Sequence, residues 1–141
     1  MWRVKQTIND AENGDCLAAC VSAIFEIPLE DVPNFVKKDT EKWEEEMCEW
    51  FYRRFGLQPI YIPIEALSMP PHGYAIMTIR PKGFKDLHAV VLKNNEFIWN
   101  PAPGYGTDIE YEVIGVTVFH VVDCEKYADY RLERTVVYGR E

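Results

Sequence analysis

The residues best suited to covalent chemistry lie in one short segment near the start of the chain. Residues 13–20 read Asn-Gly-Asp-Cys-Leu-Ala-Ala-Cys, so Cys16 follows a turn dipeptide and opens an apolar stretch. Asp15 is a good helix N-cap, which would make Cys16 the first residue of a helix. A thiol there lies near the positive end of the helix dipole, which favours the nucleophilic thiolate. An isolated cysteine is more often a packing residue, so a catalytic role for Cys16 requires a base and an orienting group elsewhere in the chain.

Two later residues supply the missing roles. His88 begins a predicted strand, and Asn100 lies on the returning strand of the same hairpin, close to opposite His88 when counted across the turn at 94–95. A side-chain amide beside an imidazole fixes the orientation and tautomer of the ring. Cys16, His88 and Asn100 therefore match a nucleophile, a base and an orienting group. A satisfied core or rim histidine is the structural alternative for His88.

The elements that must position these residues follow an α+β order, with helices first and antiparallel strands second. Helices are expected over 16–27 and 40–55, the second with Gly56 at its C-terminal cap. Strands are expected over 58–62, 74–79, 89–93, 96–99 and 113–122, and a last edge strand over 135–138. We find no internal repeat and no Gly/Ser linker, so the sequence predicts one domain over 1–141.

Composition narrows the class of protein. The net charge of −8 argues against nucleic-acid binding by phosphate neutralisation. The chain has no apolar run long enough to span a membrane, and its first residues lack the apolar core of a signal peptide. We therefore expect a cytoplasmic protein without a nucleic-acid or membrane partner. In that compartment its four cysteines are expected to be reduced.

Several of these segments together resemble a known fold. The Gly-Asp-Cys element ending at Cys16, the Ile-Pro-Leu-Glu-Asp-Val-Pro segment from Ile27, the His-Ala-Val-Val strand from His88 and the Asn-Pro corner at Asn100 are similar to those of small papain-like cysteine peptidases. They resemble compact bacterial and phage proteins related to bacteriocin-processing and NlpC-type peptidases. The resemblance implies a papain-like fold, with an N-terminal central helix packed on an antiparallel sheet. It also implies that Cys16, His88 and Asn100 form a catalytic triad.

The donors of the oxyanion hole depart from the family pattern. Related peptidases carry a glutamine six residues before the cysteine, where this chain has Asp10, and a carboxylate is a poor oxyanion donor. Gln6 is the first choice for this role and Asn13 the second, beside the backbone N–H of Cys16. Residues 1–15 are expected to form a short extended arm and a turn, and a solvated position on this arm is the structural alternative for Gln6.

Three further residues are candidates for the substrate cleft. Trp99 and Tyr105 come directly before and after the loop that follows Asn100, and we expect them to border the cleft. His72 lies in a Pro-Pro-His-Gly loop and could border it too. Loop packing is the structural alternative for the two aromatic residues, and an exposed loop position for His72.

The remaining cysteines and histidine suggest no cofactor. Cys20 lies one helical turn after Cys16, where it is either a resolving thiol or a packing residue. Cys16-x3-Cys20 and His120-x3-Cys124 could in principle bind zinc, but structural zinc pairs usually have tighter loop spacings. We therefore predict no metal and no cofactor.

The sequence leaves three functions open. The leading hypothesis is a cysteine hydrolase that acts on a peptide, amide or isopeptide bond of a peptide or protein substrate. The second is a non-catalytic binding or inhibitory module with the same fold; a phage-encoded protein that counters a host system would fit it, although no residue points there directly. The third is acyl transfer, which uses the same triad and differs only in its products.

Overall fold

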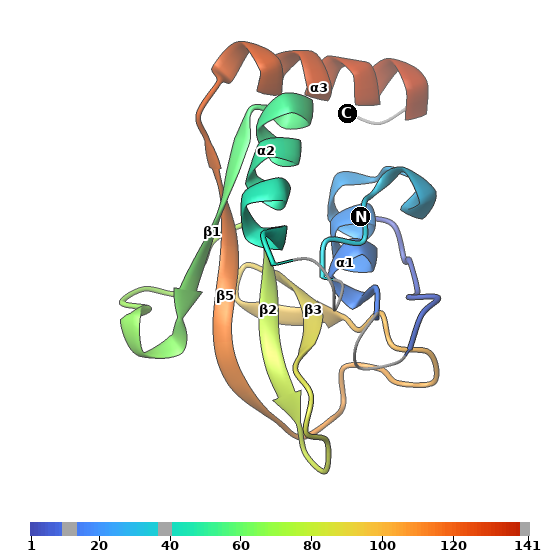
Figure 1. Cartoon of the computed structure of the whole chain (residues 1–141), viewed down its shortest axis with the longest axis vertical. Coiled ribbons are helices and arrows are strands. Elements are labelled where there is room, and N and C mark those ends of the chain that lie inside the picture. The colour runs from blue at the N-terminus through green and yellow to red at the C-terminus, as the bar shows by residue number, and fades with distance from the viewer. Residues whose placement is uncertain (10–13, 37–40, 139–141) are drawn as a thin grey trace. The chain divides into compact units, whose positions relative to one another are not determined.

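The computed structural model describes residues 1–9, 14–36 and 41–138, and in this part of the chain it contains three α-helices and a five-stranded sheet (Figure 1). The predicted α+β class is therefore confirmed. The elements are α1 (Cys16–Phe25), η1 (Leu29–Asp31), α2 (Trp43–Phe55), β1 (Leu57–Pro63), η2 (Ile64–Ala66), β2 (Tyr74–Pro81), β3 (His88–Lys93), β4 (Glu96–Trp99), β5 (Tyr111–Val121) and α3 (Cys124–Tyr138).

The sheet has the strand order β1-β5-β2-β3-β4, and β2 pairs antiparallel with both β3 and β5. The turn between β3 and β4 is made by Asn94 and Asn95, whose φ angles are 50° and 65°. Positive φ at both central residues is the signature of a tight hairpin turn that matches the twist of its strands. The predicted hairpin is confirmed, and it brings the segments that carry His88 and Asn100 side by side.

The residues group into two compact units. The first comprises Met1–Glu41 and Tyr61–Val118, and it contains α1, which contacts β3 and β2. The alanines at positions 18, 19 and 23 are almost fully buried, and their small side chains allow close packing of this helix. The helix ends at Phe25, two residues earlier than predicted, because Glu26 adopts a left-handed conformation with φ 55°. The helix is buried from Ala18 onward and packs on the sheet, as expected.

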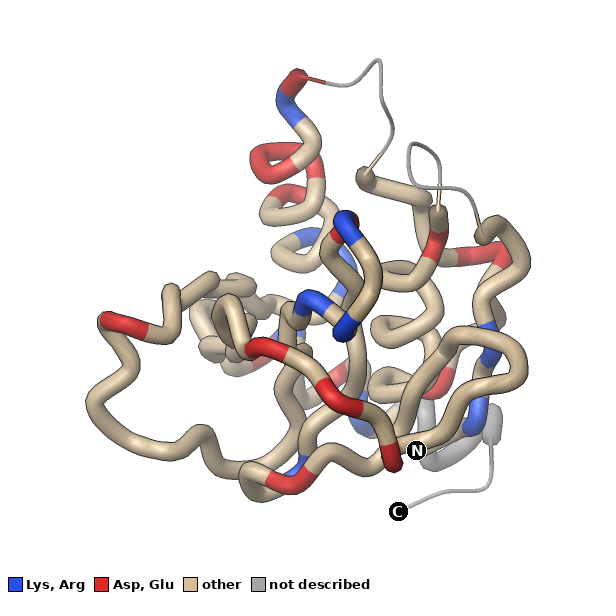
Figure 2. Tube along the Cα trace, turned by 90° about the horizontal axis from the view of Figure 1, so that it is seen from below, with Lys and Arg blue, Asp and Glu red and all other residues tan. Residues whose placement is uncertain are grey.

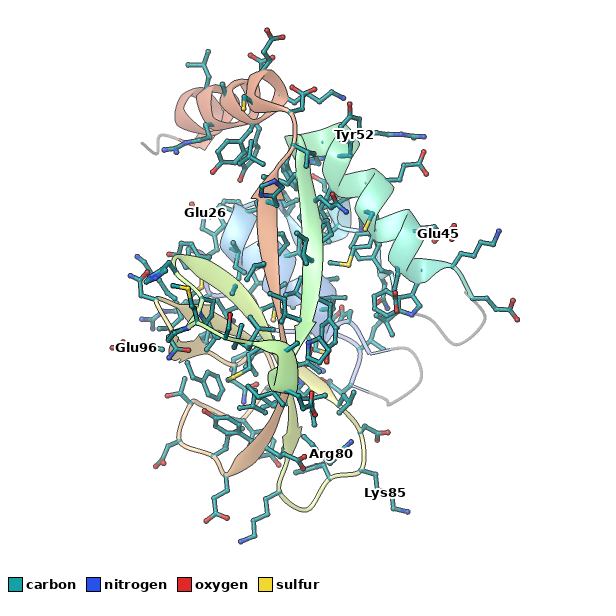
Figure 3. The ribbon with its side chains drawn as sticks, turned by 90° about the vertical axis from the view of Figure 1, so that its left-hand side faces the viewer. Glu26, Glu45, Tyr52, Arg80, Lys85 and Glu96 are labelled. Carbon is teal, nitrogen blue, oxygen red and sulfur yellow. The ribbon has the colours of Figure 1, made fainter. Side chains whose placement is uncertain are left out.

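The second unit comprises Lys42–Ile60 and Phe119–Glu141, and its core is aromatic. Phe55 packs against Tyr130 with ring centroids 4.5 Å apart, and Phe51 packs against Phe119 at 5.2 Å. Acidic residues gather in the first turn of α2, where the helix dipole favours them, which accounts for the acidic run of the sequence (Figure 2). The labelled side chain of Glu45 extends outward from this turn (Figure 3).

The predicted edge strand over 135–138 is wrong, because α3 runs through these residues. Asp123 Oδ1 accepts a hydrogen bond from the backbone N–H of Lys126 and so caps the start of the helix. One face of α3 then brings Tyr130 onto Phe55. Tertiary packing and the cap outweigh the strand preference of the β-branched residues near its end.

Gly56 offers a test of the second unit. It ends α2 with φ 66°, and a Cβ added there would overlap the backbone oxygen of Asp123. We expect Gly56→Ala to lower the free energy of unfolding by at least about 3 kcal/mol, from left-handed strain plus this overlap. Gly83→Ala is the matched control, because Gly83 has φ 87° with open space around it, and it should lose only about 1 kcal/mol. Equal losses in urea unfolding of the two variants would contradict this assignment.

Candidate active site

The side-chain amide of Asn100 is fixed by three hydrogen bonds. Its Oδ1 accepts from the backbone N–H of Ala102 at 3.0 Å and lies 2.8 Å from His88 Nε2, and its Nδ2 donates to the backbone oxygen of Gly106 at 3.0 Å. Asn100 is 2% exposed. Because the nitrogen of the amide has a carbonyl partner and the oxygen has an N–H partner, the amide has one consistent orientation. The oxygen therefore faces the imidazole.

This orientation determines the tautomer of His88. An amide oxygen only accepts hydrogen bonds, so the Nε2 that faces it must carry the proton. In the neutral ring, Nδ1 is then the nitrogen with a free lone pair, which is what a general base requires. The predicted contact between His88 and Asn100 is confirmed.

A β-bulge next to the site brings these two side chains to one face. Leu92 pairs with Phe97 but Val91 pairs with Trp99, so β4 holds one extra residue. Continuing the register past the bulge puts Asn100 opposite Val90, on the same face as His88, because alternate residues of a strand share a face. Without the bulge, Asn100 would lie opposite Ala89, and its side chain would point to the other face of the sheet.

Cys16 is the first residue of α1, as predicted, and its sulfur lies beside β3. The backbone N–H groups of Ala89 and Leu17 hydrogen-bond to the sulfur and lower the pKa of the thiol. Ala89 directly follows His88, so the Cys16 sulfur lies against the backbone at the start of the strand that carries His88. The structure thus joins His88 to Asn100 by a side-chain contact and places Cys16 beside the residue after His88, all three within the first unit.

Asp15 takes the N-cap position, but its side chain does not cap the helix. Its carboxylate instead accepts hydrogen bonds from the N–H and hydroxyl of Thr7, at 2.9 and 2.8 Å, and from the N–H of Ile8 at 3.0 Å. Asp15 therefore occupies the expected N-cap position, but the expectation that its side chain caps the helix is wrong. These hydrogen bonds connect the N-terminal arm, at residues 7 and 8, to the start of α1.

Burial is the largest influence on the pKa values of both Cys16 and His88. Burial raises the pKa of the Cys16 thiol, and the negative charge of Asp15 raises it further. Burial also lowers the pKa of His88, partly offset by the hydrogen bond to Asn100. Near neutral pH both groups are therefore uncharged, as thiol and imidazole. The N–H groups of Cys16 and Leu17 at the helix N-terminus lower the pKa of the thiol, as expected, but desolvation outweighs them and the pKa is raised overall.

Gln6, the first choice for the oxyanion hole, lies in the arm between the two halves of the site. Its backbone N–H donates to the oxygen of Pro101 at 2.9 Å, and its Nε2 donates to the oxygen of Ile8 at 3.2 Å. Its Oε1 is buried without a hydrogen-bond partner among the described residues. The amide nitrogen is thus engaged within the arm itself. Asn13, the second choice, lies outside the residues that the structure describes.

Trp99 and Tyr105 flank the loop after Asn100 but differ in environment. The indole N–H of Trp99 donates to the oxygen of Val4 at 2.7 Å, so this half-buried ring fastens the arm to the end of β4. Tyr105 is 51% exposed, and its ring meets the edge of Phe84 at 6.5 Å. Of the two, Tyr105 is the one free to meet a substrate.

His72 is not a cleft residue. In the antiparallel register Ile79 pairs with His88 and Tyr74 pairs with Lys93, so His72 precedes the opposite end of β2. At roughly 3.3 Å per residue, five residues of strand separate the two ends by about 17 Å. Two exposed apolar residues that the sequence analysis missed lie at the correct end: Phe84, at 56% exposure, and Leu87, at 50%. Both lie in the loop between β2 and β3, which leads directly into His88, and this position in the sequence is the signal that marks them.

Cys20 is fully buried on α1, so packing accounts for it. Across the described ranges no group of three or more His, Cys, Asp and Glu side chains could hold a metal ion. A search of the same residues found no helix long and apolar enough to cross a membrane.

Comparison with known proteins adds no relative. A scan against protein-family models and searches of curated proteins and of solved structures found no match to this chain.

Asp15 allows a test of the electrostatics at the thiol. Asp15→Asn keeps an oxygen acceptor for the arm but removes the charge, so the pKa of Cys16 should fall. We expect alkylation of Cys16 by iodoacetamide at pH 8 to accelerate about threefold, read by peptide mass spectrometry across a pH series. Asp86→Asn, which removes an exposed carboxylate before His88, should leave the rate unchanged. An unchanged or slower rate in Asp15→Asn would contradict the assignment.

His88 allows a test by pH-dependent stability. Since the folded state disfavours the imidazolium, the unfolded chain binds more protons below the ordinary histidine pKa of about 6.5. Stability is therefore retained above that pH and falls as the pH drops through the lower pKa of the folded state. Urea unfolding of His88→Gln should show a weaker loss on acidification than the wild type. His72→Gln should keep the wild-type dependence, and identical curves for His88→Gln and wild type would refute the burial effect.

Proposed function

We propose that this chain is a cysteine hydrolase that cleaves a peptide, amide or isopeptide bond, with Cys16 as nucleophile, His88 as general base and Asn100 as orienting residue. The observation that carries the proposal is the 2.8 Å contact between His88 Nε2 and Asn100 Oδ1. That contact leaves Nδ1 as the basic nitrogen at the start of β3, and the adjacent Ala89 N–H bonds to the Cys16 sulfur. A buried amide that is held by the loop and turns its oxygen to an imidazole is typical of an orienting group.

The proposed chemistry starts from a neutral pair. His88 Nδ1 removes the thiol proton as the sulfur attacks the substrate carbonyl carbon, and the resulting imidazolium is stabilised by Asn100. The tetrahedral intermediate collapses to a thioester while the leaving amine takes the proton from His88. Water, activated by the same nitrogen, then releases the carboxylic acid and regenerates the thiol. Backbone N–H groups at the start of α1 are candidate donors to the oxyanion.

The fold that we propose for this chemistry is papain-like. Its support is the buried helix that opens with the cysteine and contacts β3, the strand that opens with the histidine. The substrate would be a peptide or protein, and Tyr105, Phe84 and Leu87 would meet it beside the triad. A reducing compartment such as the cytoplasm would keep Cys16 a free thiol and belongs to the same proposal.

Two observations favour a second candidate, a papain-like binding or inhibitory module without turnover. Burial raises the pKa of Cys16, which lowers the fraction of thiolate available for attack. One N–H of the Gln6 side chain is engaged by the oxygen of Ile8, which ties the expected oxyanion donor to the arm and leaves it a single N–H. A protein that retained the triad geometry but lost these two features of catalysis would bind its partner without cleaving it.

An acylation assay distinguishes the candidates. With p-nitrophenyl acetate as the acyl donor, a hydrolase should form a thioester at Cys16 and release acetate over repeated cycles. Cys16→Ser should abolish turnover, and His88→Ala should slow acylation by about 100-fold or more, the usual contribution of a general base. Asn100→Ala, which leaves the ring present but unoriented, should slow it by about tenfold.

The controls use the same chain. Cys124→Ser removes an exposed thiol and should not affect turnover. An added alkylamine that captures the acyl group in preference to water would identify acyl transfer rather than hydrolysis. Equal, slow acylation of wild type and His88→Ala would refute the hydrolase and favour the binding module.

A further inference from the structure

Lys5 makes an unusual set of contacts for an arm residue. Its Nζ donates to the backbone oxygens of Asn100, Ala102 and Tyr105, at 2.9, 3.0 and 3.1 Å. These three bonds use all the donors of an ammonium group. The same Nζ lies 4.5 Å from the ring centroid of Trp99, within range of a cation–π interaction. One side chain thus holds residues 100–105, the first part of the loop that follows β4.

The loop held by Lys5 is the loop that orients the imidazole. Asn100 gives its backbone oxygen to Lys5 and its side-chain oxygen to His88, so both ends of the residue are constrained. Ala102 likewise gives its oxygen to Lys5 and its N–H to Asn100 Oδ1. Hydrogen bonds from a charged donor are shorter and stronger than those between neutral groups. Removal of the ammonium would take this donor from all three carbonyls and leave the oxygen of Ala102 with only the N–H of Tyr105, at 3.3 Å.

We propose that Lys5 is a positioning residue, which acts through the loop over 100–105 to hold the Asn100 amide against His88 and so keeps the imidazole in its Nε2-protonated form. This inference rests on the proposed function for its catalytic meaning. The geometry on which it depends, however, can be measured without any substrate.

A purely electrostatic role would act in the opposite direction. Loss of a positive charge near His88 makes the imidazolium easier to form, so it would raise the pKa of His88. Loss of the contact with Asn100 would lower it, because that hydrogen bond favours the protonated ring. The sign of the pKa change therefore separates positioning from charge.

The variant that tests the inference is Lys5→Met, which keeps a stem of similar length over Trp99 and removes the three donors. Nitrogen-15 NMR of histidine-labelled protein reports the tautomer and pKa of His88 directly. We expect the wild type to carry the proton on Nε2, and Lys5→Met to populate the Nδ1–H form and to titrate at lower pH. Lys85→Met is the matched control, because Lys85 extends from the loop between β2 and β3 into solvent (Figure 3). It removes the same charge and should leave the tautomer unchanged.

Two results would overturn the inference: a wild-type tautomer in folded Lys5→Met, or a raised pKa of His88. If Lys5→Met does not fold, Lys5→Gln, which retains two N–H donors, should show the same change at smaller size, and a wild-type tautomer there would be equally decisive. In the acylation assay we expect Lys5→Met to lower kcat about tenfold with little change in KM. A wild type without turnover, combined with a tautomer change in Lys5→Met, would refute the proposed function and leave the inference standing.

Discussion

The candidate site depends on an extended arm, residues 4–8, that is bonded on both sides. On one side Asp15 accepts hydrogen bonds from Thr7 and Ile8, which ties the arm to the start of α1. On the other side Lys5 and the N–H of Gln6 bond to the loop after β4. The arm has no regular secondary structure, so its backbone groups are free to bond to both neighbours. The arm thereby connects the start of α1 to the loop that carries Asn100, in addition to the direct contact of α1 with β3.

Burial determines the protonation states of Cys16 and His88. A thiol and an imidazole that are both desolvated rest in their neutral forms, and Asp15 reinforces this at the sulfur. In the proposed reaction, charge would appear on this pair only when the sulfur attacks a substrate carbonyl. Asp15 thus has two opposed effects, since it builds the scaffold of the site and disfavours the thiolate. A residue that keeps the oxygen but not the charge would separate the two effects.

Much of this arrangement could be predicted from local sequence signals. The turn asparagines 94 and 95 predicted the hairpin, and the turn before Cys16 predicted the start of α1, because both signals act within a few residues. The bulge at β4 could not be predicted, although it decides which face Asn100 occupies, because no residue type marks it. The roles of Lys5 and Asp15 were missed for a similar reason. Their partners are set by tertiary contacts, and a lysine or an aspartate near a terminus usually faces solvent. The place of His72 depends on the register between β2 and β3, which local sequence signals do not reveal.

The hydrogen bond between Lys5 and Asn100 joins residues 95 positions apart in the chain. Contacts of such long sequence separation form late, since the intervening loop must close before they contribute. A ribosome that has completed α1 has therefore synthesised the proposed nucleophile, Cys16, before His88 and before the loop that contacts His88. The contacts of Lys5 can form only after the hairpin has been made and the arm has folded back onto it. Under the proposed function, an incomplete copy of the chain would carry the thiol without its base.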